Sequence, residues 1–205
     1  NNPDIFSAQT MPILVAAIHA HNAYGADIIM RILGDMHRAL GAASYSALGL
    51  GASAKTTEVR ANAAEALASL VDRGMFDTTL FAKELYWLLG QHHVMAQRIE
   101  QTFRDAALIS SLAGWRIMQV LEGILPAVGE VNRGGTLVQL LAQLAGEYGV
   151  SIKIPEVLRP KMKGSTVLAK SLRALEKLQP HPTELAEQAR DQAQELLDQH
   201  RCAQP

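Results

Sequence analysis

Residues 49–56 come closest to a nucleotide-binding motif, with the sequence GLGASAKT. In a P-loop, two glycines let the backbone amides wrap the phosphates, while a Lys and a Ser or Thr bind phosphate and Mg²⁺. Lys55 and Thr56 stand in the required places, but Ala54 occupies the position of the second glycine. No apolar strand precedes this loop, and no apolar run of four residues ends in the Asp that would hold Mg²⁺. We therefore interpret residues 49–56 as a small-residue loop between helices and expect no bound cofactor.

The seven histidines and the single cysteine do not have the spacing of metal ligands. His19 and His21 would point about 200° apart on a helix, and His92 and His93 are adjacent, whereas helix-borne zinc ligands stand four residues apart. Cys202 has no second cysteine with which to form a disulfide or a cysteine-only zinc site. We therefore expect no metal, and we expect the reducing environment of the cytoplasm.

Candidate catalytic groups are scattered along the chain. Acid–base or nucleophilic catalysis needs carboxylates, or a nucleophile and a base, that converge in space. Asp35 and His37 are two residues apart and would face apart on a helix, and the sequence contains no Gly-x-Ser-x-Gly motif. Trp87 and Trp115 fall on apolar stripes, so we expect them in the core and not as stacking platforms for a ligand. We predict no catalytic residues.

Residues 153–177 carry the only strong charge asymmetry, with seven cations and two anions and thus a net charge of +5. Lys170, Arg173 and Lys177 have the spacing of one helix face. Such a stripe would meet phosphates or an acidic partner, or it is an ordinary solvated face. The candidate interaction surface consists of Lys161, Lys163, Lys170, Arg173 and Lys177.

The amino-acid composition of the chain is that of a globular domain. The 205 residues are 48% hydrophobic, 5% aromatic and 19% charged, with a formal net charge of −1. An apolar stretch at residues 11–18 is too short to cross a bilayer, which needs about 20 residues. We therefore expect no membrane association.

Apolar residues recur at the spacing i, i+3, i+4 and i+7 along the whole chain, which predicts an all-α fold. Asp77 and Thr136 stand where helix N-caps are expected, and Gly49 and Gly51 stand near expected helix ends. About nine helices are predicted: residues 11–22, 26–40, 57–73, 77–90, 95–106, 112–125, 137–148, 168–175 and 183–200.

The predicted helices come in short-looped pairs, which favours a stack of helical hairpins over a single globular bundle. The pair 57–73 and 77–90 spans about 35 residues, a length typical of helical repeats. We expect one continuous domain in which residues 1–150 form the repeats, 151–164 an irregular connector and 165–205 a C-terminal helical pair that closes the stack. The apolar stripe of the last helix would cap this stack or contact another chain.

Residues 59–70, VRANAAEALASL, resemble a helix of the HEAT-repeat family. The resemblance covers 12 residues, and Ala54 to Thr57 stand where the family often has an aspartate. The longer segments 60–81 and 115–144 are similar to stretches of large bacterial proteins with HEAT-like repeats. The positions that match are Val59, Arg60, Ala63, Ala64, Leu67 and Leu70.

This resemblance implies a HEAT/armadillo-like right-handed α-α superhelix, in which Arg60 would bond carbonyls or carboxylates between repeats. It also implies a non-catalytic scaffold for protein–protein interaction. The chain begins with Asn1 and not with Met, as expected of a processed protein or of a piece of a larger one. The first alternative to this function is a HEAT-like module that binds nucleic acid through residues 153–177. The second alternative is an enzyme with a cleft between helices.

Overall fold

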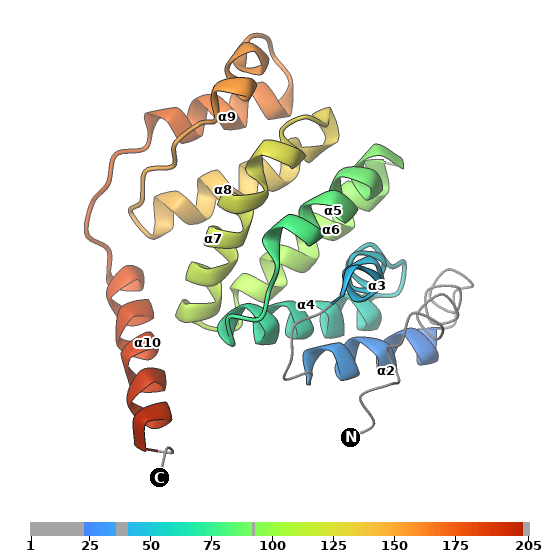
Figure 1. Ribbon diagram of the computed structural model, residues 1–205. Helices are drawn as coiled ribbons and strands as arrows, with labels where there is room; N and C mark the ends of the chain where they lie inside the picture. Colours follow the sequence, from blue (N-terminus) through green and yellow to red (C-terminus); the bar gives the residue numbers. More distant parts are fainter. Residues whose placement is uncertain (1–22, 36–40, 92, 203–205) are drawn as a thin grey trace.

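The computed structural model describes residues 23–35, 41–91 and 93–202, and every regular element within these ranges is helical (Figure 1). The predicted all-α class is therefore confirmed, while the predicted helix 11–22 lies outside the described residues. The α-helices are α2 (Ala23–Gly34), α3 (Ala42–Ala52), α4 (Thr57–Asp72), α5 (Thr78–Gln91), α6 (His93–Ala107), α7 (Ser111–Val128), α8 (Gly135–Glu147), α9 (Val167–Lys177) and α10 (Glu184–Cys202). Two short 3-10 helices, η2 (Asn132–Gly134) and η3 (Glu156–Met162), precede α8 and α9.

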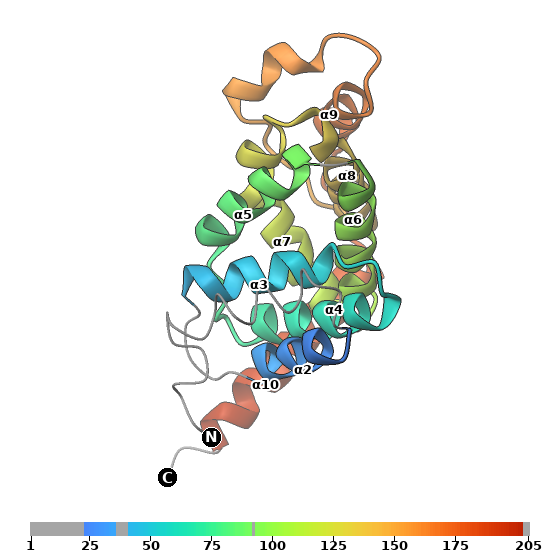
Figure 2. The same cartoon turned by 90° about the vertical axis from the view of Figure 1, so that its right-hand side faces the viewer.

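Most helices pack against the second helix along the chain, which produces two layers (Figure 2). In one layer α2 contacts α4, α4 contacts α6, and α6 contacts α8, while α9, the next α-helix along the chain, packs on α8. In the other layer α3 contacts α5, and α5 contacts α7.

Helix α7 contacts helices of both layers. It packs against α4, α5, α6, α8 and α10, and its contacts with α4 and α10 join it to helices that are distant from it along the chain. The buried residues of α7 are Leu112, Ala113, Gly114, Ile117, Met118, Val120, Leu121, Ile124, Leu125 and Val128. The core is therefore continuous from layer to layer around this helix.

Helix α3 corrects the interpretation of residues 49–56 as a loop, because Gly49 and Gly51 lie inside it. A Cβ added at Gly49 would stand 2.7 Å from the Cδ1 of Leu88, and one added at Gly51 would collide with Met30. These glycines allow close helix packing and do not end a helix. The turn begins at Ser53, whose hydroxyl donates to the carbonyl oxygen of Leu50 at 3.0 Å.

The two predicted N-caps have different outcomes. The Oδ1 of Asp77 accepts hydrogen bonds from the amides of Thr79 and Leu80, both at 2.9 Å, as expected. The prediction for Thr136 is wrong, because α8 starts at Gly135, directly after η2. The Oγ1 of Thr136 is buried without a hydrogen-bond partner in the described structure.

The chain after α8 is held against the body at several points. Within the predicted connector 151–164, the side chains of Ile152, Ile154 and Leu158 are buried, and η3 packs against α9. The last two helices have different neighbours: α9 lies on α8, and α10 lies on α7. Side-chain amide oxygens of α10 accept hydrogen bonds at the start of α7: Ser111 Oγ to Gln188 Oε1 at 2.9 Å and Leu112 N to Gln192 Oε1 at 2.8 Å.

The close packing around α7 can be tested by a small substitution at Gly114. A Cβ there would collide with the hydroxyl of Tyr148 and would stand 2.9 Å from the carbonyl oxygen of Ala107. We expect Gly114→Ala to lower the free energy of unfolding in urea by about 1–3 kcal/mol, because overpacking displaces both neighbours.

Gly90→Ala is the matched control, since nothing lies within 4 Å of its added Cβ. Alanine is the better helix former, so this variant should be unchanged or gain up to about 1 kcal/mol. Equal stabilities of the two variants would contradict the crowding at Gly114.

Candidate functional site

The α6–α8 hollow is a depression of 340 Å³ at the point where the ends of α6 and α8 meet the starts of α7 and α10. Its floor contains the buried side chains of Leu140, Leu144 and Tyr148. Its rim carries Leu108, whose surface is 77% exposed, and the partly exposed Leu185. The lining residues are Arg104, Ala107, Leu108, Ser110, Ser111, Leu140, Gln143, Leu144, Glu147, Tyr148 and Leu185.

The exposure of Leu108 follows from how α6 ends. Helix α6 stops at Ala107, and Ser110 then caps α7 by accepting a hydrogen bond from the amide of Ala113 at 3.0 Å. Only a short turn separates the two helices, so Leu108 is left outside both apolar stripes. Sequence reasoning missed this residue. The available signal was an apolar pair, Leu108 and Ile109, directly before a serine that can cap a helix.

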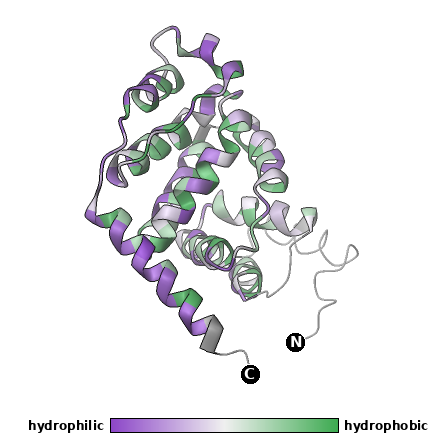
Figure 3. Ribbon diagram, turned by 60° about the vertical axis from the view of Figure 1, so that its left-hand side comes forward, coloured by the Kyte–Doolittle hydropathy of each residue, from purple (hydrophilic) through white to green (hydrophobic). Residues whose placement is uncertain are grey.

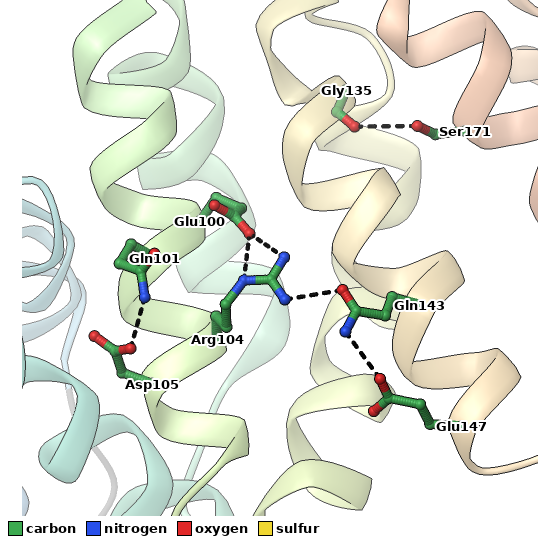
Figure 4. A network of polar contacts seen from close by, with 8 residues as sticks. All are labelled: Glu100, Gln101, Arg104, Asp105, Gly135, Gln143, Glu147 and Ser171. Carbon is green, nitrogen blue, oxygen red and sulfur yellow. Dashed lines mark hydrogen bonds and ion pairs between the residues drawn. The ribbon is translucent and has the colours of Figure 1, made fainter.

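A row of polar side chains forms one edge of the α6–α8 hollow (Figure 4). Arg104 donates to the Oε1 of Glu100 through Nε at 3.0 Å and through Nη2 at 2.7 Å. Its Nη1 donates to the Oε1 of Gln143 at 2.8 Å, and Gln143 Nε2 donates to Glu147 at 2.8 Å. The row crosses from α6 to α8, so its donors and acceptors have fixed positions beside an apolar floor.

The hydroxyl groups of the hollow are engaged in structural hydrogen bonds. The Tyr148 hydroxyl donates to the carbonyl oxygen of Ser111 at 2.6 Å, and Ser111 itself donates to Gln188. Burial raises the pKa of Tyr148, and the nearby Glu147 raises it further, so the phenol is neutral at pH 7. The Tyr148 ring meets Trp115 edge-on with 5.6 Å between ring centroids. This arrangement suits the holding of an apolar group.

Two members of the predicted basic surface are bonded to the body of the protein. Lys161 donates to the carbonyl oxygen of Glu130 at 2.6 Å and lies 3.4 Å from its carboxylate. Arg173 donates to the carbonyl oxygens of Met162 and Gly164 and thereby holds the turn before α9. The structure therefore does not bring all five predicted cations together as one free surface.

The remaining members, Lys163, Lys170 and Lys177, are exposed. Lys170 lines a second hollow between α8 and α9. The neighbouring Arg159 is bonded to Glu156 at 2.9 Å and to Glu176 at 3.2 Å, so both anions of this region are paired.

The HEAT-like positions lie on α4, and five of them are buried: Val59, Ala63, Ala64, Leu67 and Leu70. Arg60 donates to the carbonyl oxygens of Ala54 and Lys55, both at 2.8 Å. It therefore bonds carbonyls as expected, but these carbonyls belong to the turn that precedes its own helix.

Trp87 contradicts the expectation that both tryptophans are in the core, because it is 53% exposed. The buried face of α5 consists of Phe81, Leu85, Leu88 and Leu89, and position 87 lies beside this face. Trp115 is partly buried against the core, as expected.

A third hollow, of 180 Å³, lies between α4, α5 and α7, with Arg116 among its lining residues. The Oδ1 of Asp72 and the Nε of Arg116 are both buried without a hydrogen-bond partner in the described part of the chain. Burial raises the pKa of Asp72, and the attraction of Arg116 offsets this only in part.

No group of three or more His, Cys, Asp or Glu side chains among the described residues is placed to hold a metal ion. His19, His21 and His92 lie outside the described residues. Within the described ranges, no helix has both the length and the apolarity needed to span a bilayer.

Comparison of the chain with protein-family models, curated proteins and solved structures found no match.

The raised pKa of Asp72 predicts a pH-dependent effect on stability. The folded state favours the protonated Asp72 carboxyl, which therefore contributes to the free energy of unfolding. This stabilisation is fully present below the pKa that Asp72 has in the unfolded chain, and it is lost as the pH rises through the raised pKa of the folded state. We expect Asp72→Asn to unfold at higher urea concentration than the wild type at pH 7, and the gap to close below about pH 4. The same substitution at the exposed Asp35 should leave the urea midpoint at pH 7 unchanged. A lower stability of Asp72→Asn at pH 7 would contradict the prediction.

Proposed function

We propose that this chain is a non-catalytic, HEAT-like scaffold that binds a protein partner. The packing of each helix from α2 to α6 on the second helix along the chain supports an arrangement of stacked hairpins. The alanine-rich buried face of α4 supports the resemblance to HEAT repeats. A single cysteine, Cys202, is compatible with a cytoplasmic location.

The α6–α8 hollow is the observation that carries this proposal. Protein interfaces depend on a few apolar anchors that are buried in a preformed pocket and surrounded by polar groups. The hollow offers an apolar floor, Leu108 and Leu185 on its rim, and the fixed polar edge of Arg104, Gln143 and Glu147. A partner segment with one large apolar side chain would cover Leu108 and meet amide and carboxylate oxygens beside it.

The exposed Lys163, Lys170 and Lys177 favour nucleic-acid binding as a second candidate. Three phosphate contacts would make log K for duplex DNA fall with log salt at a slope of about −2.7. Affinity that does not vary with salt would count against this candidate.

Peptides selected from a randomised display library test the proposed protein-binding site. Peptides that bind the wild-type protein should bind Leu108→Asp at least about tenfold more weakly, because a carboxylate would replace an apolar contact. Isothermal titration calorimetry would measure both affinities.

Val157→Asp is the matched control, because Val157 is 58% exposed and belongs to η3, outside the hollow. Both variants should unfold at the wild-type temperature, since neither side chain is in the core. If the selected peptides bound Leu108→Asp as tightly as the control, the hollow would not be the binding site.

A further inference from the structure

The α8–α9 groove is an open depression of 330 Å³ on the outside of the body. It is lined by Gln139, Ala142, Val167, Lys170, Ser171 and Ala174. Val167 is a large apolar residue and is half-exposed at the first turn of α9. The groove is a place where a second helix would bury apolar surface that α8 and α9 leave in solvent.

Lysines mark one edge of this groove. Lys170 is part of its lining, and Lys177 stands two helical turns further along the same face of α9. Because Arg159 pairs with both Glu156 and Glu176, the anions nearest in sequence already have partners. The charge of this edge is therefore positive, in keeping with the net +5 of residues 153–177.

Helix α10 has the opposite charge on its outer face. Its carboxylates stand at i, i+3, i+7, i+11 and i+14, which places them in one row along the helix, and all are exposed: Glu184, Glu187, Asp191, Glu195 and Asp198. The opposite face carries the buried Ala189, and the two glutamines that bond α7, Gln188 and Gln192, lie on the flank between the two faces. The acidic row is therefore on the side of α10 opposite its buried residue, and most of α10 is hydrophilic (Figure 3).

The two faces match in spacing as well as in charge. Asp191 and Asp198 are seven residues apart, and so are Lys170 and Lys177, so each pair spans about 10.5 Å along its helix. Leu197 is also half-exposed, but it directly precedes Asp198 and therefore points about 100° away from it around the helix.

One chain cannot make this contact with itself. Helix α9 lies at one end of the body and the last turns of α10 lie at the other end, in both Figure 1 and Figure 2. Two hydrogen bonds from α7 also fix the first half of α10 in place. We propose that the chain associates head to tail with a second copy of itself, with the acidic face of α10 from one copy on the α8–α9 groove of the next. Such a contact is heterologous and leads to a ring or to an open row of copies.

Charge reversal tests this association by sedimentation velocity over a range of protein concentrations. The wild type should self-associate at low salt and dissociate as salt screens the contact. One variant combines Lys170→Glu with Lys177→Glu, and the other combines Asp191→Lys with Asp198→Lys. Each alone should show a Kd for self-association at least about tenfold higher, because like charges then face each other. An equimolar mixture of the two should associate again, since each groove then meets an α10 of opposite charge.

The control combines Lys55→Glu with Lys83→Glu, which changes the net charge equally at exposed positions outside the groove. It should associate like the wild type. The proposal would be overturned if the wild type stayed monomeric at all concentrations. It would also be overturned if either charge-reversal variant alone associated normally, or if the mixture of the two stayed monomeric. The outcome is independent of peptide binding at the α6–α8 hollow, so Leu108→Asp should still self-associate.

Discussion

The fold depends on one constraint: α7 must fit between helices on nearly every side. Ten of its residues are buried, and it contacts helices from both layers as well as α10. Close approach requires small side chains, and Gly114 meets the Tyr148 hydroxyl with no room for a methyl group. Because the same Tyr148 hydroxyl bonds the carbonyl oxygen of Ser111, the start of α7 and the end of α8 are fixed relative to each other. The fold combines a layered order of hairpins with a single central helix.

The α6–α8 hollow is a consequence of this packing. Its walls are the ends of helices that converge on the start of α7, and α10 closes one side through hydrogen bonds to Ser111 and Leu112. Leu108 is exposed because it lies in the short turn between the end of α6 and the Ser110 cap of α7, and so belongs to the buried face of neither helix. The outer faces of α9 and α10 are not needed for this packing. Their opposite charges are therefore available for contacts with other molecules.

The sequence predicted the helices whose buried side is a regular stripe, from α4 to α10, because packing follows that stripe. Helix α3 was not predicted, because its small residues and two glycines let it pack without a regular apolar stripe. Gly49 and Gly51 also resemble the glycines that commonly end helices. The exposure of Trp87 depends on which face of α5 has a neighbour, which the sequence does not contain. The carbonyl partners of Lys161 and Arg173 depend on how distant turns meet, so the loss of these two cations from the free surface was not foreseeable.

Native-state hydrogen exchange measured by NMR tests the central role of α7 most directly. If α7 joins both layers into one cooperative core, its slowest amides should exchange only through global unfolding. The slowest amides of α4, α7 and α8 should then all give the same free energy of opening, and it should equal the free energy of global unfolding measured in urea. The amides of α10 should give a lower free energy of opening. A stack of independent hairpins would behave differently. Separate opening free energies for α4 and α8, with α7 below the global value, would contradict the account.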